Sequence, residues 1–202
     1  MNIDLINKVT SSAFNIFAVG SSLFVLFYIL KKGLNGKIAK VLFFSAFGSV
    51  FFLAFLKSGV QYFFWRSDKF AKYFLPPYAD ISYFFQSSFF NFFFQALASL
   101  VFGLLMLAVF YLIGRLFKKR FLTLEDGYLF LGFSLLAGWP YFFIYVGFIF
   151  LAALAYLSYV SISKKDLKQN IGLTYLFPIS YLATFVFGVY LAKILNLYIF
   201  TI

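Results

Sequence analysis

Long apolar segments alternate with short polar and basic connections along the whole chain. A transmembrane helix needs about 20 predominantly apolar residues. The pattern predicts helices of about that size over residues 13–30, 41–56, 83–113, 141–162 and 171–197, with a shorter apolar run at 127–138. We therefore expect an all-α fold, a polytopic transmembrane helical bundle of five to six spans that forms one integral membrane domain over residues 1–202.

The segment 83–113 is uncharged and allows two arrangements. As one helix it would be about 46 Å long, which exceeds a hydrocarbon core of about 30 Å. A fold-back within it would instead return the chain to the same membrane face. Its polar side chains at helical spacing either hydrogen-bond to neighbouring helices or line a substrate groove. They are Ser88, Asn91, Gln95 and Ser99.

Composition requires lipid as the solvent for much of the surface. The chain is 64% hydrophobic and 11% charged, whereas soluble domains are about 45–50% apolar and about 25% charged. The net charge of +11 comes from basic clusters between the apolar segments. Such clusters fit anionic lipid headgroups, and no separate basic domain indicates a nucleic-acid partner. The expected partners are the bilayer and other membrane proteins, and the expected location is a prokaryotic cell membrane.

Charge alone does not orient the chain. Each of the main connections contains three or four lysines or arginines, so the positive-inside rule barely discriminates between the two topologies. Lys57, at the end of the second predicted span, is expected to extend its ammonium group toward the membrane surface.

The chain contains neither cysteine nor histidine. This excludes a serine–histidine or cysteine–histidine nucleophile, histidine-bearing zinc sites, and haem or iron–sulfur ligation by these residues. We therefore expect no metal and no cofactor. Any hydrolytic chemistry would have to use carboxylates.

Two of the six acidic residues stand side by side at Glu125 and Asp126, directly before the apolar run at 127–138. Acids in the first turn of a helix stabilise it by about 0.3–1 kcal/mol each, which gives both a structural role. Gly138-Trp139-Pro140 ends the run, as a turn between two passes or between a re-entrant piece and a pass. Asp80 is expected to cap a helix that begins near Ile81.

A catalytic role for Asp126 requires a second carboxylate nearby. Two close carboxylates share a proton, so that one acts as a base toward water while the other donates to the scissile carbonyl. Asp68, in a loop before a proline, is the candidate partner of Asp126. Glu125 is a tentative third member that changes the local charge.

The order of these features carries a family resemblance. Asp68 precedes Leu75-Pro76, the acid pair follows, and Gly138-Trp139 and then Phe177-Pro178 come after it. This order resembles the prepilin peptidases, membrane aspartyl proteases that process type IV prepilin leaders. The resemblance implies an Asp68/Asp126 dyad. The family usually fits two spans between its aspartates, and a single pass over 83–113 would separate the pair across the membrane.

Three functions are compatible with these observations. We expect a non-catalytic role, as a scaffold or a subunit of a larger complex, because each candidate acid has a structural explanation. The alternative is a divergent prepilin-peptidase-like protease that uses Asp68 and Asp126. A second alternative is a transporter, which would depend on intramembrane polar residues such as Asn91 and Gln95.

Overall fold

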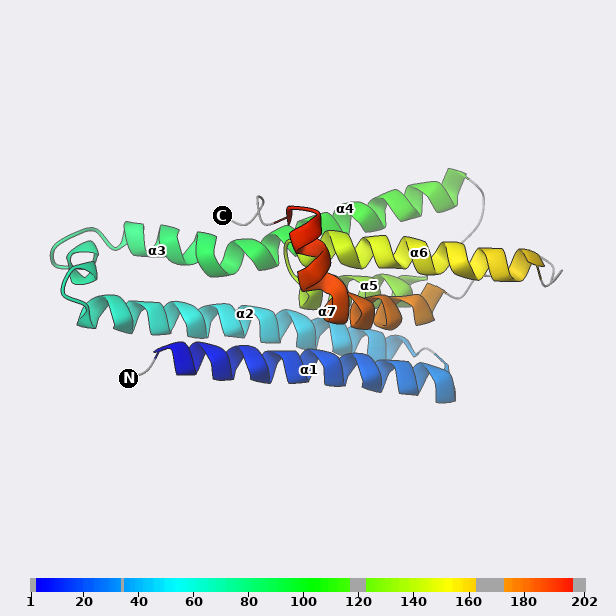
Figure 1. Ribbon diagram of the computed structural model, residues 1–202, viewed down its shortest axis with the longest axis horizontal. Coiled ribbons are helices and arrows are strands. Elements are labelled where there is room, and N and C mark those ends of the chain that lie inside the picture. Colours follow the sequence, from blue (N-terminus) through cyan, green and yellow to red (C-terminus); the bar gives the residue numbers. More distant parts are fainter. Residues whose placement is uncertain (1–2, 34, 117–122, 163–172, 198–202) are drawn as a thin grey trace.

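The computed structural model describes residues 3–33, 35–116, 123–162 and 173–197, and this part of the chain is helical with short turns and no strand. The all-α prediction is confirmed for these residues. The helices form an elongated bundle with most axes along its length (Figure 1). They are α1 (Ile3–Lys32), α2 (Gly36–Ser67), α3 (Ser82–Ser88), α4 (Phe94–Leu116), α5 (Leu124–Ala137), α6 (Tyr141–Ile162) and α7 (Leu176–Ile194).

Gly33 and Asn35 stabilise the turn between α1 and α2. Gly33 adopts a φ of 76°, which glycine tolerates because it has no Cβ. Its N–H donates to the Ile29 carbonyl at 3.0 Å and so satisfies one of the last carbonyls of α1. The side chain of Asn35 then caps α2 by accepting the Lys37 N–H at 3.0 Å. Helix α1 therefore ends at Lys32 and α2 begins at Gly36.

The segment 83–113 lies in one continuous helical rod. A π-helical turn at Phe89–Phe93 joins α3 directly to α4, without a loop between them. Such a turn inserts one extra residue into a helix without ending it. Of the two arrangements that the sequence allows, the chain adopts the single pass.

Helices α5 and α6 form a hairpin inside the bundle. The 14 residues of α5 reach about 21 Å, less than a hydrocarbon core of about 30 Å. A turn with Gly138 at φ 70° reverses the chain, and α6 runs back toward the end at which α5 began (Figure 1). The predicted break at Gly138-Trp139-Pro140 is confirmed.

Four helical stretches of the described chain are long and apolar enough to cross a membrane. The predicted count of five to six spans is not confirmed, because four stretches of the described residues meet these criteria and α5, with 14 residues, is too short. The four stretches are Ser11–Lys31, Gly36–Ser67, Ser82–Leu112 and Leu176–Ile194.

The core is centred on α5, which is apolar around its whole circumference. Every residue from Leu129 to Leu136 is buried, as expected of a helix that is hydrophobic on all sides. Phe130 is 0% exposed and its ring contacts those of Phe110, Tyr145 and Phe177. These contacts join α5 to α4, α6 and α7.

Helices α2 and α5 approach closely through small residues. Ala39 and Ala46 of α2 are 0% exposed. On α5, a Cβ added to Gly132 would lie 3.4 Å from the Phe43 Cα and 3.4 Å from Leu42 Cδ2. Small residues at a membrane helix interface let the backbones pack together.

Substitution of Gly132 by valine is expected to separate α5 from α2. The added carbons meet the backbone of α2, and overpacking of this kind costs about 1–3 kcal/mol. Unfolding in mixed micelles of increasing dodecyl sulfate content measures the loss. Gly147→Val in α6 is the matched control, because a Cβ there has no neighbour within 4 Å. Equal stability of the two variants would contradict the close approach.

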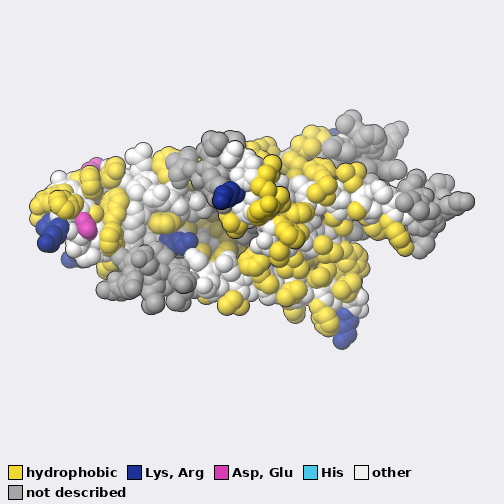
Figure 2. All heavy atoms as spheres, viewed as in Figure 1, with side chains coloured by type: hydrophobic (Ala, Val, Ile, Leu, Met, Phe, Trp, Pro, Cys, Tyr) yellow, Lys and Arg dark blue, Asp and Glu magenta, His cyan; other side chains and the backbone are white. Residues whose placement is uncertain are grey.

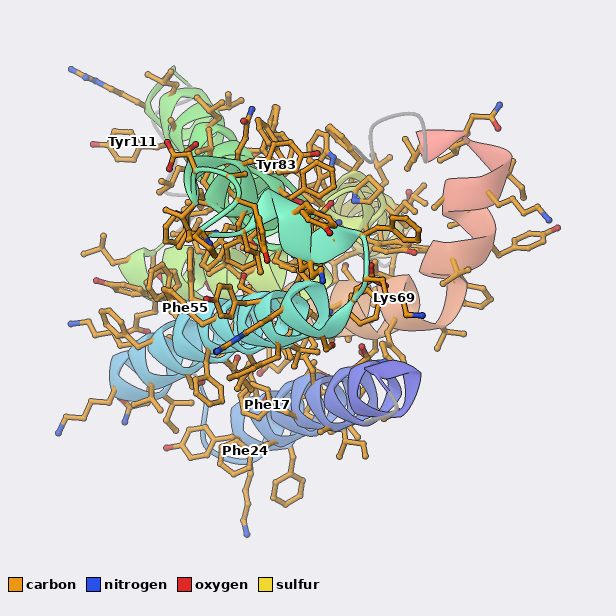
Figure 3. The ribbon with its side chains drawn as sticks, turned by 90° about the vertical axis from the view of Figure 1, so that its left-hand side faces the viewer. Phe17, Phe24, Phe55, Lys69, Tyr83 and Tyr111 are labelled. Carbon is orange, nitrogen blue, oxygen red and sulfur yellow. The ribbon has the colours of Figure 1, made fainter. Side chains whose placement is uncertain are left out.

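The outer surface is apolar and aromatic. Phe24 of α1 is 60% exposed and Tyr111 of α4 is 71% exposed, and both point away from the bundle in Figure 3. Hydrophobic side chains cover much of the face in Figure 2. Such a surface suits contact with lipid, as expected of an integral membrane protein.

Candidate functional site

The acid pair begins α5, as predicted. Thr123 is the N-cap residue, and its hydroxyl oxygen accepts the Asp126 N–H at 3.2 Å. Asp126 Oδ2 in turn accepts the Thr123 N–H at 3.0 Å and its hydroxyl at 2.9 Å. This reciprocal arrangement is a capping box, which satisfies N–H groups that the first helical turn leaves unpaired.

Asp126 also ties α5 to the start of α7. The hydroxyl of Thr174, in the 3₁₀ turn Leu173–Tyr175, donates to Asp126 Oδ1 at 2.6 Å. Asp126 is 5% exposed, and both of its oxygens accept hydrogen bonds. Thr174 lies 48 residues away and no local pattern singles it out. The Asp126 side chain therefore connects α5 with the turn that leads into α7.

Glu125 lies against the start of α2. A Cβ placed on Gly36 would come within 2.7 Å of Glu125 Oε1, so the carboxylate lies next to the first residue of that helix. A carboxylate near a helix N-terminus interacts favourably with the helix dipole. The beginnings of α2, α5 and α7 thus meet at one end of the molecule.

Asp68 follows the last residue of α2 at the opposite end of that helix. Its Oδ1 accepts the N–H groups of Phe70 and Ala71, each at 2.8 Å. These two backbone donors, Ala71 first, hold the pKa of the Asp68 carboxyl below its usual range because they stabilise the ionised form. Asp68 therefore stays charged at neutral pH and shapes the turn after α2.

The structure does not bring Asp68 together with Asp126 and Glu125. The 32 residues of α2 separate them, and a helix of that length spans about 48 Å. Two carboxylates can share a proton or a water only within a few ångströms. The predicted dyad does not form here, since the single pass through 83–113 returns the chain to the end where α5 begins. No cluster of three or more potential metal-ligating His, Cys, Asp or Glu residues occurs in the described chain.

The predicted polar face of 83–113 divides into two parts. In the first part, Ser88 donates to Gln61 Oε1 of α2 at 3.3 Å, and Gln61 Nε2 donates to Ser87 at 3.2 Å. These bonds agree with the inward, interhelical interpretation. Asp80 accepts the Ser82 N–H at 3.2 Å, but the N-cap residue of α3 is Ile81, so the predicted cap is present only as this bond from the residue before the N-cap.

The second part of the polar face lines a cavity of about 340 Å³ in the middle of the molecule. Residues from α1, α2, the α3–α4 rod and the α5–α6 turn surround it. Its polar side chains include Ser11, Asn15, Lys57, Asn91 and Gln95. No carboxylate contributes to the described lining. From the sequence, Lys57 was predicted only to lie at the end of a span. The periodicity of one helix does not show which side chains of other helices line the same cavity.

Comparison with known proteins adds no assignment. No protein-family model, curated protein or solved structure matches this chain. The resemblance to prepilin peptidases therefore stays a prediction from the sequence.

Proposed function

We propose that this chain is a non-catalytic integral membrane protein that acts as a scaffold or subunit of a larger membrane complex. The observation that carries the proposal is the separation of Asp68 from Asp126 by the whole of α2. Each carboxylate accepts hydrogen bonds from its own surroundings instead of facing a partner acid. The remaining support comes from the charge distribution and from the shape of the bundle.

Basic residues are frequent near one end of the fold. The C-terminal ends of α1, α4 and α6 lie at the end where α2, α5 and α7 begin (Figure 1). We call this the basic end. By sequence, the segments at or directly after these three helix ends contain Lys31, Lys32, Lys37, Lys40, Arg115, Lys118, Lys119, Arg120, Lys164, Lys165 and Lys168. The connection between α2 and α3 contains only Lys69 and Lys72, with Arg66 beside it. By the positive-inside rule, the basic end faces the cytoplasm.

Cysteine accessibility in intact cells tests this orientation, and the chain has no native cysteine to interfere. Tyr78→Cys, in the α2–α3 connection, is expected to react with a membrane-impermeant maleimide in intact cells. Asn35→Cys, at the basic end, is expected to react only after the membrane is permeabilised. The reverse pattern would contradict the assignment. Denatured protein, in which both cysteines react, is the control.

The opposite end forms an arm that extends past a membrane of ordinary thickness. Helix α2 is about 48 Å long, so it exceeds a hydrocarbon core of about 30 Å by about 18 Å when the basic end lies at one face. The arm, residues 58–88, exposes Phe63, Phe70 and Phe85 by 63%, 81% and 62%. Large apolar side chains exposed outside the hydrocarbon core favour contacts with other proteins. The arm is the surface that we assign to the complex partner.

Affinity purification in a mild detergent tests the proposed role. We expect one stoichiometric partner protein, and we expect its recovery to fall at least severalfold in the combined variant Phe63→Ala and Phe85→Ala. Phe24→Ala with Phe52→Ala is the matched control, because both side chains are similarly exposed but lie outside the arm. Isolation of the chain alone would contradict the role. So would a leader-peptide cleavage activity that Asp126→Ala abolishes and Asp80→Ala leaves intact.

A further inference from the structure

The central cavity has the chemistry of an anion site. Lys57 supplies a positive charge, and the amides of Asn15, Asn91 and Gln95 supply N–H donors. The described lining contains no acid that could neutralise the lysine. Ionisable groups that face a cavity inside a membrane bundle mark functional sites more often than structural ones.

The position of the cavity along the bundle corresponds to that of a headgroup layer. Lys57 lies 21 residues after Gly36, which corresponds to about 32 Å along α2. Gln95 lies 20 residues before Arg115, which corresponds to about 30 Å along α4. These lengths agree with a hydrocarbon core of about 30 Å. With the basic end at one membrane face, the polar lining therefore lies at the level of the opposite headgroups.

A second cavity adjoins the first and becomes apolar toward α7. It has a volume of about 310 Å³ and shares Phe14, Asn15 and Tyr141 with the first cavity. It passes Thr184 and continues along Phe185 and Val189, and we call this far part the groove. A polar pocket that leads into an apolar groove fits a molecule with a charged head and a hydrocarbon chain. A small inorganic anion would make no use of the groove.

We propose that this cavity binds an anionic phospholipid of the leaflet opposite the basic end. The phosphate lies against Lys57 and the amides of Asn91 and Gln95, and an acyl chain passes Phe14 into the groove. The site is independent of the proposed complex partner, because its lining lies at the base of the arm and not on its exposed aromatic surface.

Quenching of Trp139, which lines the cavity, reports occupancy directly. The chain has two tryptophans, so Trp65→Phe leaves Trp139 as a single reporter. In nanodiscs, phosphatidylglycerol with chains brominated near the headgroup is expected to quench Trp139 at about fivefold lower mole fraction than the equally brominated phosphatidylcholine. A factor of five corresponds to about 1 kcal/mol, the attraction of one lysine to a net anionic headgroup that the zwitterionic phosphatidylcholine lacks.

Variants of Lys57 decide the assignment. Lys57→Gln is expected to remove the lipid preference and Lys57→Arg to retain it, while Lys193→Gln, at an exposed lysine in the last turn of α7, leaves it unchanged. Equal quenching by both lipids in the parent protein, or a preference that survives Lys57→Gln, would overturn the proposal. Loss of the preference in millimolar inorganic phosphate would overturn the lipid assignment in favour of a soluble anion.

Discussion

Replacement of Asp126 by alanine is expected to lower the free energy of unfolding by about 3 kcal/mol. The loss combines an N-cap contribution of about 1 kcal/mol with charge-assisted hydrogen bonds of about 1.5–3 kcal/mol, which overlap in part. The hydroxyl of Thr174 and the N–H of Thr123 would lose the acceptor they now share. Dodecyl sulfate unfolding of the purified protein, followed by circular dichroism, measures the change.

A double-mutant cycle identifies the connection that causes this loss. Thr174→Val alone removes the bond to Asp126 Oδ1 and is expected to cost about 1 kcal/mol. In the Asp126→Ala background it should cost almost nothing, because the partner is already gone. Asp80→Ala is the control: its carboxylate accepts one N–H at 3.2 Å on an exposed turn, so the effect should stay below about 1 kcal/mol. Additive costs for Asp126 and Thr174 would contradict the tie between α5 and α7.

Substitution of Phe130 by alanine is expected to cost about 3–5 kcal/mol, the range for large-to-small changes at fully packed sites. The ring lies between α4, α6 and α7, and lipid cannot fill the cavity left behind because the side chain is 0% exposed. The same unfolding assay measures the loss. The expected result for Phe52→Ala is within about 0.5 kcal/mol of the parent protein, because this side chain is 64% exposed to the surroundings. Similar losses for the two variants would contradict the placement of α5 at the centre.

Local patterns predicted much of this fold correctly. The apolar segments became helices, the acid pair begins α5, and Gly138 with its neighbours forms the turn, because each depends on hydropathy, capping or backbone freedom within a few residues. The number of passes was harder to predict. A short apolar run such as 127–138 can be buried in a bundle as well as span a membrane, and length alone does not separate the two.

The candidate site was predicted less well because it depends on contacts between distant helices. Asp68 and Asp126 can pair only if 83–113 folds back, but the helix continues through a π-helical turn inside that segment without reversing. No local sequence pattern indicates the hydrogen bond between Thr174 and Asp126 or the position of Lys57 in the cavity lining.

The distance between the two ends of α2 tests the central claim most directly. Spin labels on Lys69→Cys, beside Asp68, and Leu124→Cys, beside Glu125, occupy exposed positions in a chain without native cysteine. Double electron–electron resonance in nanodiscs is expected to give a distance distribution centred at about 45–50 Å, the length of a helix of this size. A population below about 20 Å would bring the carboxylates within reach of one another and would contradict a non-catalytic protein built on separated acids.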